Sequence, residues 1–194
     1  MRILGVDPGL MVTGYGVIEA GSSSAAGESG FSFAKTSEKS RRSVSEGGQF
    51  KLLEAGVIKS SADQGLPRRL SCLYQALQEI INEYKPANLV LEELYSHYKH
   101  QMTAIAMAHA RGVIALCADK EKQISLISYP AKRVRLALTG NGNASKAQVQ
   151  RTVQNIFSLA VPPSPADVSD ALALAVAHAY IASANSRGIE SGRK

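Results

Sequence analysis

The chain has 194 residues, of which 45% are hydrophobic and 20% charged, as is typical of a soluble globular protein rather than a disordered one. Lysine and arginine outnumber aspartate and glutamate by 22 to 16, and the net charge of +6 hints at a polyanionic partner without requiring one. The longest apolar run, Ala171 to Ala182, is too short to span a bilayer. The two cysteines, Cys72 and Cys117, lack partners at metal-ligand spacing, so we expect buried, reduced thiols in a cytoplasmic protein.

The first twenty residues predict two strands around a tight turn. Ile3 to Val6 form a short β-rich run that ends at the turn signal Asp7-Pro8-Gly9, and Val12 to Glu19 resumes as a strand. Gly14 and Gly16 inside the second run suggest a turn or a close approach of another backbone. The sequence therefore predicts a hairpin with Asp7 near its bend.

Residues 20–48 differ in composition from the rest of the chain. Nine of these 29 residues are serine and five are glycine, so the segment can bury little and we expect a flexible insertion. A third strand is predicted from Phe50 to Ile58. We expect one domain over residues 1–183, interrupted by this insertion and followed by a polar tail over residues 184–194.

Beyond the third strand, helical and strand patterns alternate. The predicted elements are a helix at Leu66 to Tyr84, a strand at Asn88 to Glu92, a helix near Met102 to Ala118, a strand at Gln123 to Tyr129, and helices at Ala131 to Leu138, Ser145 to Leu159 and Ala166 to Ala182. Ser164 is the expected N-cap of the last helix, with Pro165 at its first position. This order predicts a mixed α/β sheet with the first strand near its centre.

Four carboxylates occupy positions from which they could meet. Asp7 and Glu92 each follow a predicted strand, and sites in α/β sheets gather at the carboxyl ends of strands. Asp167 and Asp170 are three residues apart on one helix and share a face. Such crowded charges repel unless a hard divalent cation such as Mg²⁺ binds them, and two such ions could cleave a phosphodiester. Taken singly, Asp167 could instead favour the helix N-terminus and Asp170 could be surface charge.

The segment from Tyr129 to Arg151 is basic. It contains five basic residues and no acid, namely Lys132, Arg133, Arg135, Lys146 and Arg151. Such a stretch suits DNA phosphates and predicts salt-dependent binding, although a solvated basic surface is the alternative.

Five motifs in chain order resemble those of the RuvC-type Holliday junction resolvases, or crossover junction endodeoxyribonucleases. They are Asp7-Pro8-Gly9 with Thr13-Gly14-Tyr15-Gly16, Leu91-Glu92-Glu93 with Tyr95, His109-Ala110-Arg111-Gly112-Val113, Asn143 to Val149, and Ala166-Asp167 with Asp170 to Ala173. The resemblance implies a ribonuclease-H-like fold, with a mixed five-stranded sheet flanked by helices. It also implies paired symmetric nicks in four-way DNA junctions during recombination and repair, leaving 5′-phosphate and 3′-hydroxyl ends.

The same resemblance implies roles for individual residues. Asp7, Glu92, Asp167 and Asp170 would be the catalytic acids that bind two Mg²⁺ ions, with Mn²⁺ as a possible substitute; some family members have His at the position of Asp167. Arg135 and Lys146 match basic positions associated with DNA contact and catalysis. Tyr95 falls where the family has an aromatic residue near the junction, and a structural tyrosine is the alternative.

The resemblance further implies a symmetric homodimer and a partner complex of the RuvA and RuvB type, which binds junctions and drives branch migration. Small residues in the alanine-rich segment Met102 to Ala118 make it the candidate dimer surface, with a buried helix of a monomer as the alternative. Three rival functions stay open: a module that binds junctions without cutting, a ribonuclease-H-like nuclease for RNA or nicked duplex, and a sugar-kinase or actin-like ATPase. For the last, 194 residues leave little room.

Overall fold

A five-stranded mixed sheet forms the centre of the protein. The computed structural model describes residues 1–21, 49–61, 63–93, 101–120 and 124–191. The strands are β1 (Arg2–Asp7), β2 (Val12–Ala20), β3 (Phe50–Lys59), β4 (Asn88–Glu92) and β5 (Ser125–Tyr129), in the spatial order β3-β2-β1-β4-β5. β1 and β3 run antiparallel to β2, whereas β4 runs parallel to both β1 and β5. The predicted mixed sheet with its first strand in the centre is confirmed.

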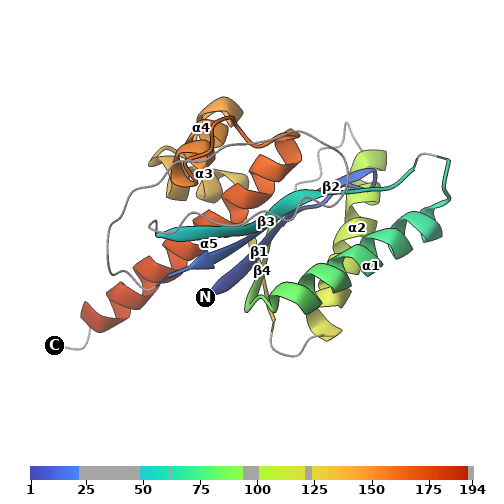
Figure 1. Cartoon of the computed structure of the whole chain (residues 1–194), viewed down its shortest axis with the longest axis horizontal. Helices are drawn as coiled ribbons and strands as arrows, with labels where there is room; N and C mark the ends of the chain where they lie inside the picture. The colour runs from blue at the N-terminus through green and yellow to red at the C-terminus, as the bar shows by residue number, and fades with distance from the viewer. Residues whose placement is uncertain (22–48, 62, 94–100, 121–123, 192–194) are drawn as a thin grey trace.

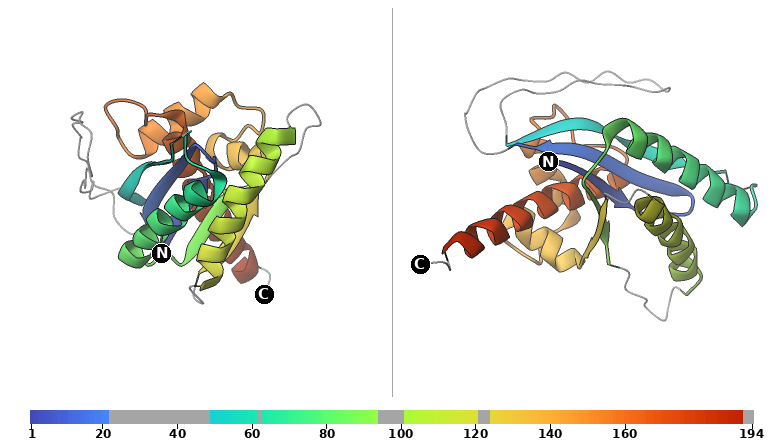
Figure 2. Two further views of the ribbon diagram at one scale, coloured as in Figure 1. Left: turned by 90° about the vertical axis from the view of Figure 1, so that its right-hand side faces the viewer. Right: turned by 90° about the horizontal axis from the view of Figure 1, so that it is seen from below.

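Helices cover both faces of this sheet (Figure 1, Figure 2). One face carries α1 (Leu66–Tyr84) and α2 (Gln101–Lys120), and the other carries α3 (Ala131–Thr139), α4 (Lys146–Ile156) and α5 (Ala166–Ser191). Alternation along the strands divides the core, because successive side chains of a strand point to opposite faces. Leu4 and Leu89 belong to the cluster under α1 and α2, whereas Ile3 and Val90 belong to the cluster around α5.

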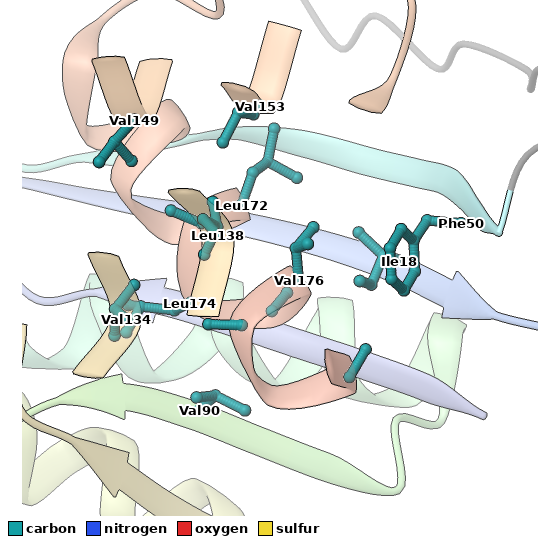
Figure 3. Packing of buried hydrophobic residues seen from close by; sticks show 14 of the residues in the cluster. Ile18, Phe50, Val90, Val134, Leu138, Val149, Val153, Leu172, Leu174 and Val176 are labelled. Carbon is teal, nitrogen blue, oxygen red and sulfur yellow. The ribbon is translucent and has the colours of Figure 1, made fainter. Parts of the chain in front are cut away.

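Apolar side chains attach α3 and α4 to α5. Figure 3 shows Val134 and Leu138 of α3 and Val149 and Val153 of α4 gathered around Leu172 and its neighbours on α5. The start of α4 is set by a reciprocal capping box: the Ser145 hydroxyl accepts from the Gln148 N–H at 3.3 Å, and the Gln148 side chain accepts from the Ser145 N–H at 2.7 Å. The three helices therefore form one layer with a defined turn between α3 and α4.

α5 lies unusually close to the sheet, because glycines face it. A Cβ atom built on Gly5 would lie 2.0 Å from the Ala171 carbonyl oxygen, and one built on Gly14 would lie 2.1 Å from that of Asp167. Real Cβ atoms do not approach a backbone this closely, so both positions require glycine while α5 keeps its place. The close approach suggested by Gly14 in the sequence is thus a contact with α5.

Several element boundaries differ from the predictions. α5 begins at Ala166, and the Pro165 carbonyl accepts from the Val168 N–H at 3.1 Å, so Pro165 and not Ser164 occupies the capping position. The same helix continues to Ser191 instead of ending near Ala182, because alanine and other tolerated residues allow helix to extend into the predicted tail. α4 ends at Ile156, close to Ser158 with its positive φ of 49°.

Other sequence expectations concern the cysteines and the insertion. Both cysteines are free; Cys117 is buried, whereas Cys72 is only partly buried. Residues 22–48, nearly all of the predicted insertion, lie outside the described residues. Within the described part of the chain, no helix combines the length and the apolar character needed to cross a membrane.

The contact between α5 and β1 predicts a large effect of one added methyl group. In Gly5→Ala the new Cβ would meet the Ala171 backbone, which cannot give way without moving α5. We expect the free energy of unfolding to fall by about 3 kcal/mol in urea denaturation. Gly21→Ala is the control, since nothing lies within 4 Å of a Cβ at Gly21, and it should change stability by less than about 0.5 kcal/mol. Equal stability of the two variants would contradict the packing argument.

Candidate active site

Asp7 and Glu92 end neighbouring parallel strands at the centre of the sheet. Val6 of β1 lies opposite Leu91 of β4, so the next residues along the two strands are Asp7 and Glu92. Val6 and Leu91 both pack toward α1 and α2. Because side chains alternate along a strand, Asp7 and Glu92 face the opposite side, where α5 lies.

The turn after β1 is closed by a buried hydroxyl. Thr13 is 1% exposed, and its Oγ1 donates to the Gly9 carbonyl at 2.6 Å and accepts from the Gly9 N–H at 3.3 Å. Beyond this turn Gly14 pairs with Asp7 across the ladder. The backbone at Asp7 is therefore held both by the sheet and by the turn that follows it.

α5 brings the two remaining carboxylates to the same place. The Asp167 backbone lies against Gly14, the ladder partner of Asp7, and Asp170 follows one turn later on α5. Burial, followed by the charges of Asp170, Glu92 and Asp167, raises the pKa of Asp7 to about 7. All four predicted acids therefore act on one electrostatic centre.

Glu92 lies in the same environment as Asp7, but a larger number of basic residues act on it. Burial and the charge of Asp170 raise the pKa of the Glu92 carboxyl, and Arg135, Lys146 and Arg111 oppose that rise. The site thus consists of partly buried carboxylates bordered by basic side chains from α2, α3 and α4.

Lys146 is the basic residue that contacts an acid of the site. Its Nζ lies 3.0 Å from Asp170 Oδ2, and the exposed fractions of the two side chains are 72% and 24%. The hydrogen bond and charge of Asp170, then the charges of Asp7 and Glu92, raise the pKa of Lys146. The structure therefore places this predicted DNA-contact residue in direct contact with Asp170 and within the field of Asp7 and Glu92.

Arg111 of α2 is a residue of the site to which the sequence assigned no role. Its guanidinium donates to the Glu92 carbonyl oxygen and, at 3.3 Å, to the Ser128 hydroxyl of β5. These contacts tie α2 to the ends of β4 and β5 just where Glu92 leaves the sheet. The motif at residues 109–113 contains Arg111, but only the tertiary packing reveals its target.

The donor set of the site fits a hard divalent cation. All four acids offer oxygen atoms, which Mg²⁺ and Mn²⁺ prefer, and burial together with the three neighbouring carboxylates raises the pKa of Asp7. Across the described residues, no three acidic, histidine or cysteine side chains are arranged to hold an ion as they stand.

The other predicted DNA-contact residues differ in how exposed they are and in whether they act on the carboxylates. Lys132, Arg133 and Arg151 are exposed on α3 and α4, whereas Arg135 is partly buried and acts on Glu92. The Arg133 guanidinium lies 5.2 Å from the ring centre of Tyr129, the last residue of β5. Tyr95 lies outside the described residues, so its predicted contact stays a prediction.

A mixed five-stranded sheet with acids at the ends of β1 and β4, covered by a helix that carries two more, is characteristic of the ribonuclease-H-like fold. The family model described as "Crossover junction endodeoxyribonuclease RuvC" matches residues 43–178. A protein of that description from Alkaliphilus metalliredigens is 36% identical over 93% of both chains, and one from Rhodopirellula baltica is 38% identical over 93% of this chain and 86% of its own. The chain belongs to the RuvC family of crossover junction endodeoxyribonucleases.

Solved structures agree with this assignment. Thermus thermophilus RuvC superposes with a TM-score of 0.77 at 24% identity, covering 95% of this chain and 97% of its own, which supports the fold. The T. thermophilus protein in complex with a Holliday junction substrate gives a TM-score of 0.75 at 25% identity, covering 95% and 96% of the two chains. The ribonuclease-H-like fold expected from the sequence is confirmed.

The raised pKa of Asp7 predicts a pH-dependent cost in stability. Between pH 3.8, the ordinary pKa of an aspartate, and about pH 7, the unfolded chain loses the Asp7 proton while the folded protein keeps it. The unfolded state then binds fewer protons, so the free energy of unfolding falls as pH rises through this window. Asp7→Asn removes this dependence and should be more stable than wild type by about 2–4 kcal/mol at pH 8, with little difference at pH 4.

Urea denaturation at several pH values in the presence of a chelator measures this difference. Asp119→Asn, an exposed position on α2, is the matched control and should follow the wild-type curve at every pH. If the free energy of unfolding of Asp7→Asn and of wild type changed in parallel from pH 4 to pH 8, the raised pKa of Asp7 would be contradicted.

Proposed function

We propose that this protein is a metal-dependent endonuclease that resolves four-way DNA junctions by paired symmetric nicks during recombination and repair. The observation that carries the proposal is the convergence of Asp7, Glu92, Asp167 and Asp170 at one end of the central strands in a chain of the RuvC family. Metal-dependent phosphodiester hydrolysis needs oxygen ligands for cations at a place that a DNA strand can reach. The products would carry 5′-phosphate and 3′-hydroxyl ends.

In this proposal the four carboxylates hold two Mg²⁺ ions, or Mn²⁺ in their place. When bound, the ions would supply an activated water and stabilise the leaving 3′-oxygen. Asp7 is the central ligand, because it lies on the middle strand and the charges of all three other acids act on it. Arg111 is a positioning residue that fixes the backbone of Glu92, and Lys146 can supply positive charge beside the scissile phosphate.

The basic residues of α3 and α4 are proposed to hold the DNA backbone. Lys132, Arg133 and Arg151 are exposed, and α3 and α4 pack against α5, so these cations keep a constant relation to Asp167 and Asp170. The solved complex of the T. thermophilus relative with a Holliday junction substrate supports junction DNA as the ligand. Binding through phosphates should weaken steeply with salt. Tyr95 is proposed to stack near the junction.

We propose that α2 provides a symmetric dimer surface. Met102, Ile105 and Leu116 are 77%, 49% and 49% exposed, and the latter two line an open groove that also includes Ala108 and Gly112. Apolar residues next to small ones allow two helices to approach closely. A two-fold dimer would present two sites to two strands of like polarity, as paired nicking requires. The dimer would act in the cytoplasm with a junction-binding and branch-migration complex of the RuvA and RuvB type.

The decisive test of function is cleavage of a synthetic mobile four-way junction. Wild-type protein with Mg²⁺ should nick opposite strands symmetrically, while a chelator should abolish nicking and a linear duplex of the same sequence should stay intact. Asp7→Asn should bind the junction but cut at least about 1,000-fold more slowly, since it weakens cation binding at the central ligand. Binding without metal-dependent cutting by wild type would indicate a junction-binding module, and equal cutting of the duplex a general nuclease.

The dimer surface generates a separate prediction for sedimentation velocity at micromolar concentration. Wild type should sediment as a dimer, and Leu116→Glu should be mainly monomeric because it buries a charge in the apolar contact. Val161→Glu is the matched control, since Val161 is 53% exposed but lies in the loop before α5, and it should remain dimeric. A wild-type monomer, both alone and with junction DNA, would refute the proposed dimer.

A further inference from the structure

We infer that Lys146 and the divalent cation compete for Asp170, so that the protein free of DNA holds its own ammonium group on a metal ligand. This inference rests on the proposed function and concerns how the same site is loaded. Metal binding would displace Lys146 from Asp170, and the freed ammonium could then turn to a DNA phosphate. The lysine thus couples loading of the metal to engagement of DNA.

The first support is the geometry of the ion pair. Lys146 Nζ contacts Asp170 Oδ2 at 3.0 Å and so occupies an oxygen atom that a cation would need. The contact is directed by the fold, because Lys146 is the first residue of α4 and lies inside the capping box that Ser145 and Gln148 form. α4 in turn packs on α5, which carries Asp170.

The second support is the unequal exposure of the partners. Asp170 is held on a helix that packs on the sheet, and its side chain is only 24% exposed. The Lys146 side chain is 72% exposed, and its long aliphatic stem can move while the helix stays in place. An ion pair with one exposed partner is weak enough for a divalent cation to displace.

The third support comes from the surrounding charges. Arg111 binds the Glu92 carbonyl rather than a carboxylate, and within the described residues no ion pair joins Arg135 to an acid of the site. Lys146 is therefore the cation that masks a carboxylate there.

The test is Mn²⁺ binding to the DNA-free protein, measured by isothermal titration calorimetry. Lys146→Met removes the competing ammonium but keeps an aliphatic side chain, and it should bind Mn²⁺ roughly three- to ten-fold more tightly than wild type. Junction cleavage by the same variant should fall, because the charge beside the phosphate is lost. Thermal melting of Lys146→Met would verify that the exposed substitution leaves the protein folded.

Arg135→Met is the matched control. It also removes one positive charge that acts on Glu92, but it breaks no contact with Asp170. Its Mn²⁺ affinity should rise by less than about two-fold. If the Mn²⁺ affinity rose equally in the two variants, the loss of one positive charge would explain the effect, and the inference of direct competition would be overturned.

A second measurement observes the lysine directly. The side-chain ammonium signal of Lys146 in a nitrogen-edited NMR spectrum, assigned by its loss in Lys146→Met, should shift as Mg²⁺ is added to wild-type protein. An unchanged signal, unchanged Mn²⁺ affinity in Lys146→Met, or no Mn²⁺ binding by either protein at millimolar concentration would each overturn the inference. If wild type still cleaves junctions in that buffer, the proposed function stands while the competition fails.

Discussion

The close contact between α5 and the glycines of the central strands is the constraint on which the rest of the structure depends. A side chain at Gly5 or Gly14 would push α5 away from the sheet. α5 carries Asp167 and Asp170 at its start, and α3 and α4 pack upon it (Figure 3). The distance between the strand-end acids and the helix acids, and the place of the basic helices beside them, are therefore both set by backbone contact.

The packing of α5 on the sheet also brings together four carboxylates whose negative charges the fold does not fully neutralise. Burial and three like charges act on Asp7, so the arrangement opposes folding at neutral pH, and the proposed cations would offset this repulsion. Two basic residues moderate this conflict differently. Arg111 fixes the backbone at Glu92 from a partly buried place on α2, whereas Lys146 reaches Asp170 through an exposed, flexible side chain. Arg111 thus holds the local backbone, whereas Lys146 is the residue that we infer exchanges partners.

Sequence patterns predicted much of the fold and the meeting of the acids. Asp7 and Glu92 follow β-rich runs, and Asp167 and Asp170 have helical spacing, so local rules sufficed to place them, while their catalytic roles remain a proposal. The contacts of Arg111 with Glu92 and of Lys146 with Asp170 could not be predicted, because they join residues 19 and 24 positions apart through tertiary packing. The end of α5 was placed too early, since polar composition alone does not end a helix.

The length of α5 has a practical use. The helix starts at the carboxylates and runs on past the sheet toward the C-terminus (Figure 1), and Asn185 is exposed on it. At 1.5 Å per residue, Asn185 lies about 22 Å along the axis from Asp170. A fluorophore attached through Asn185→Cys would therefore be fixed to the same helix as Asp167 and Asp170 but would lie far from both acids. In the proposed dimer, one such label on each protomer would report the distance between the two sets of acids with and without junction DNA.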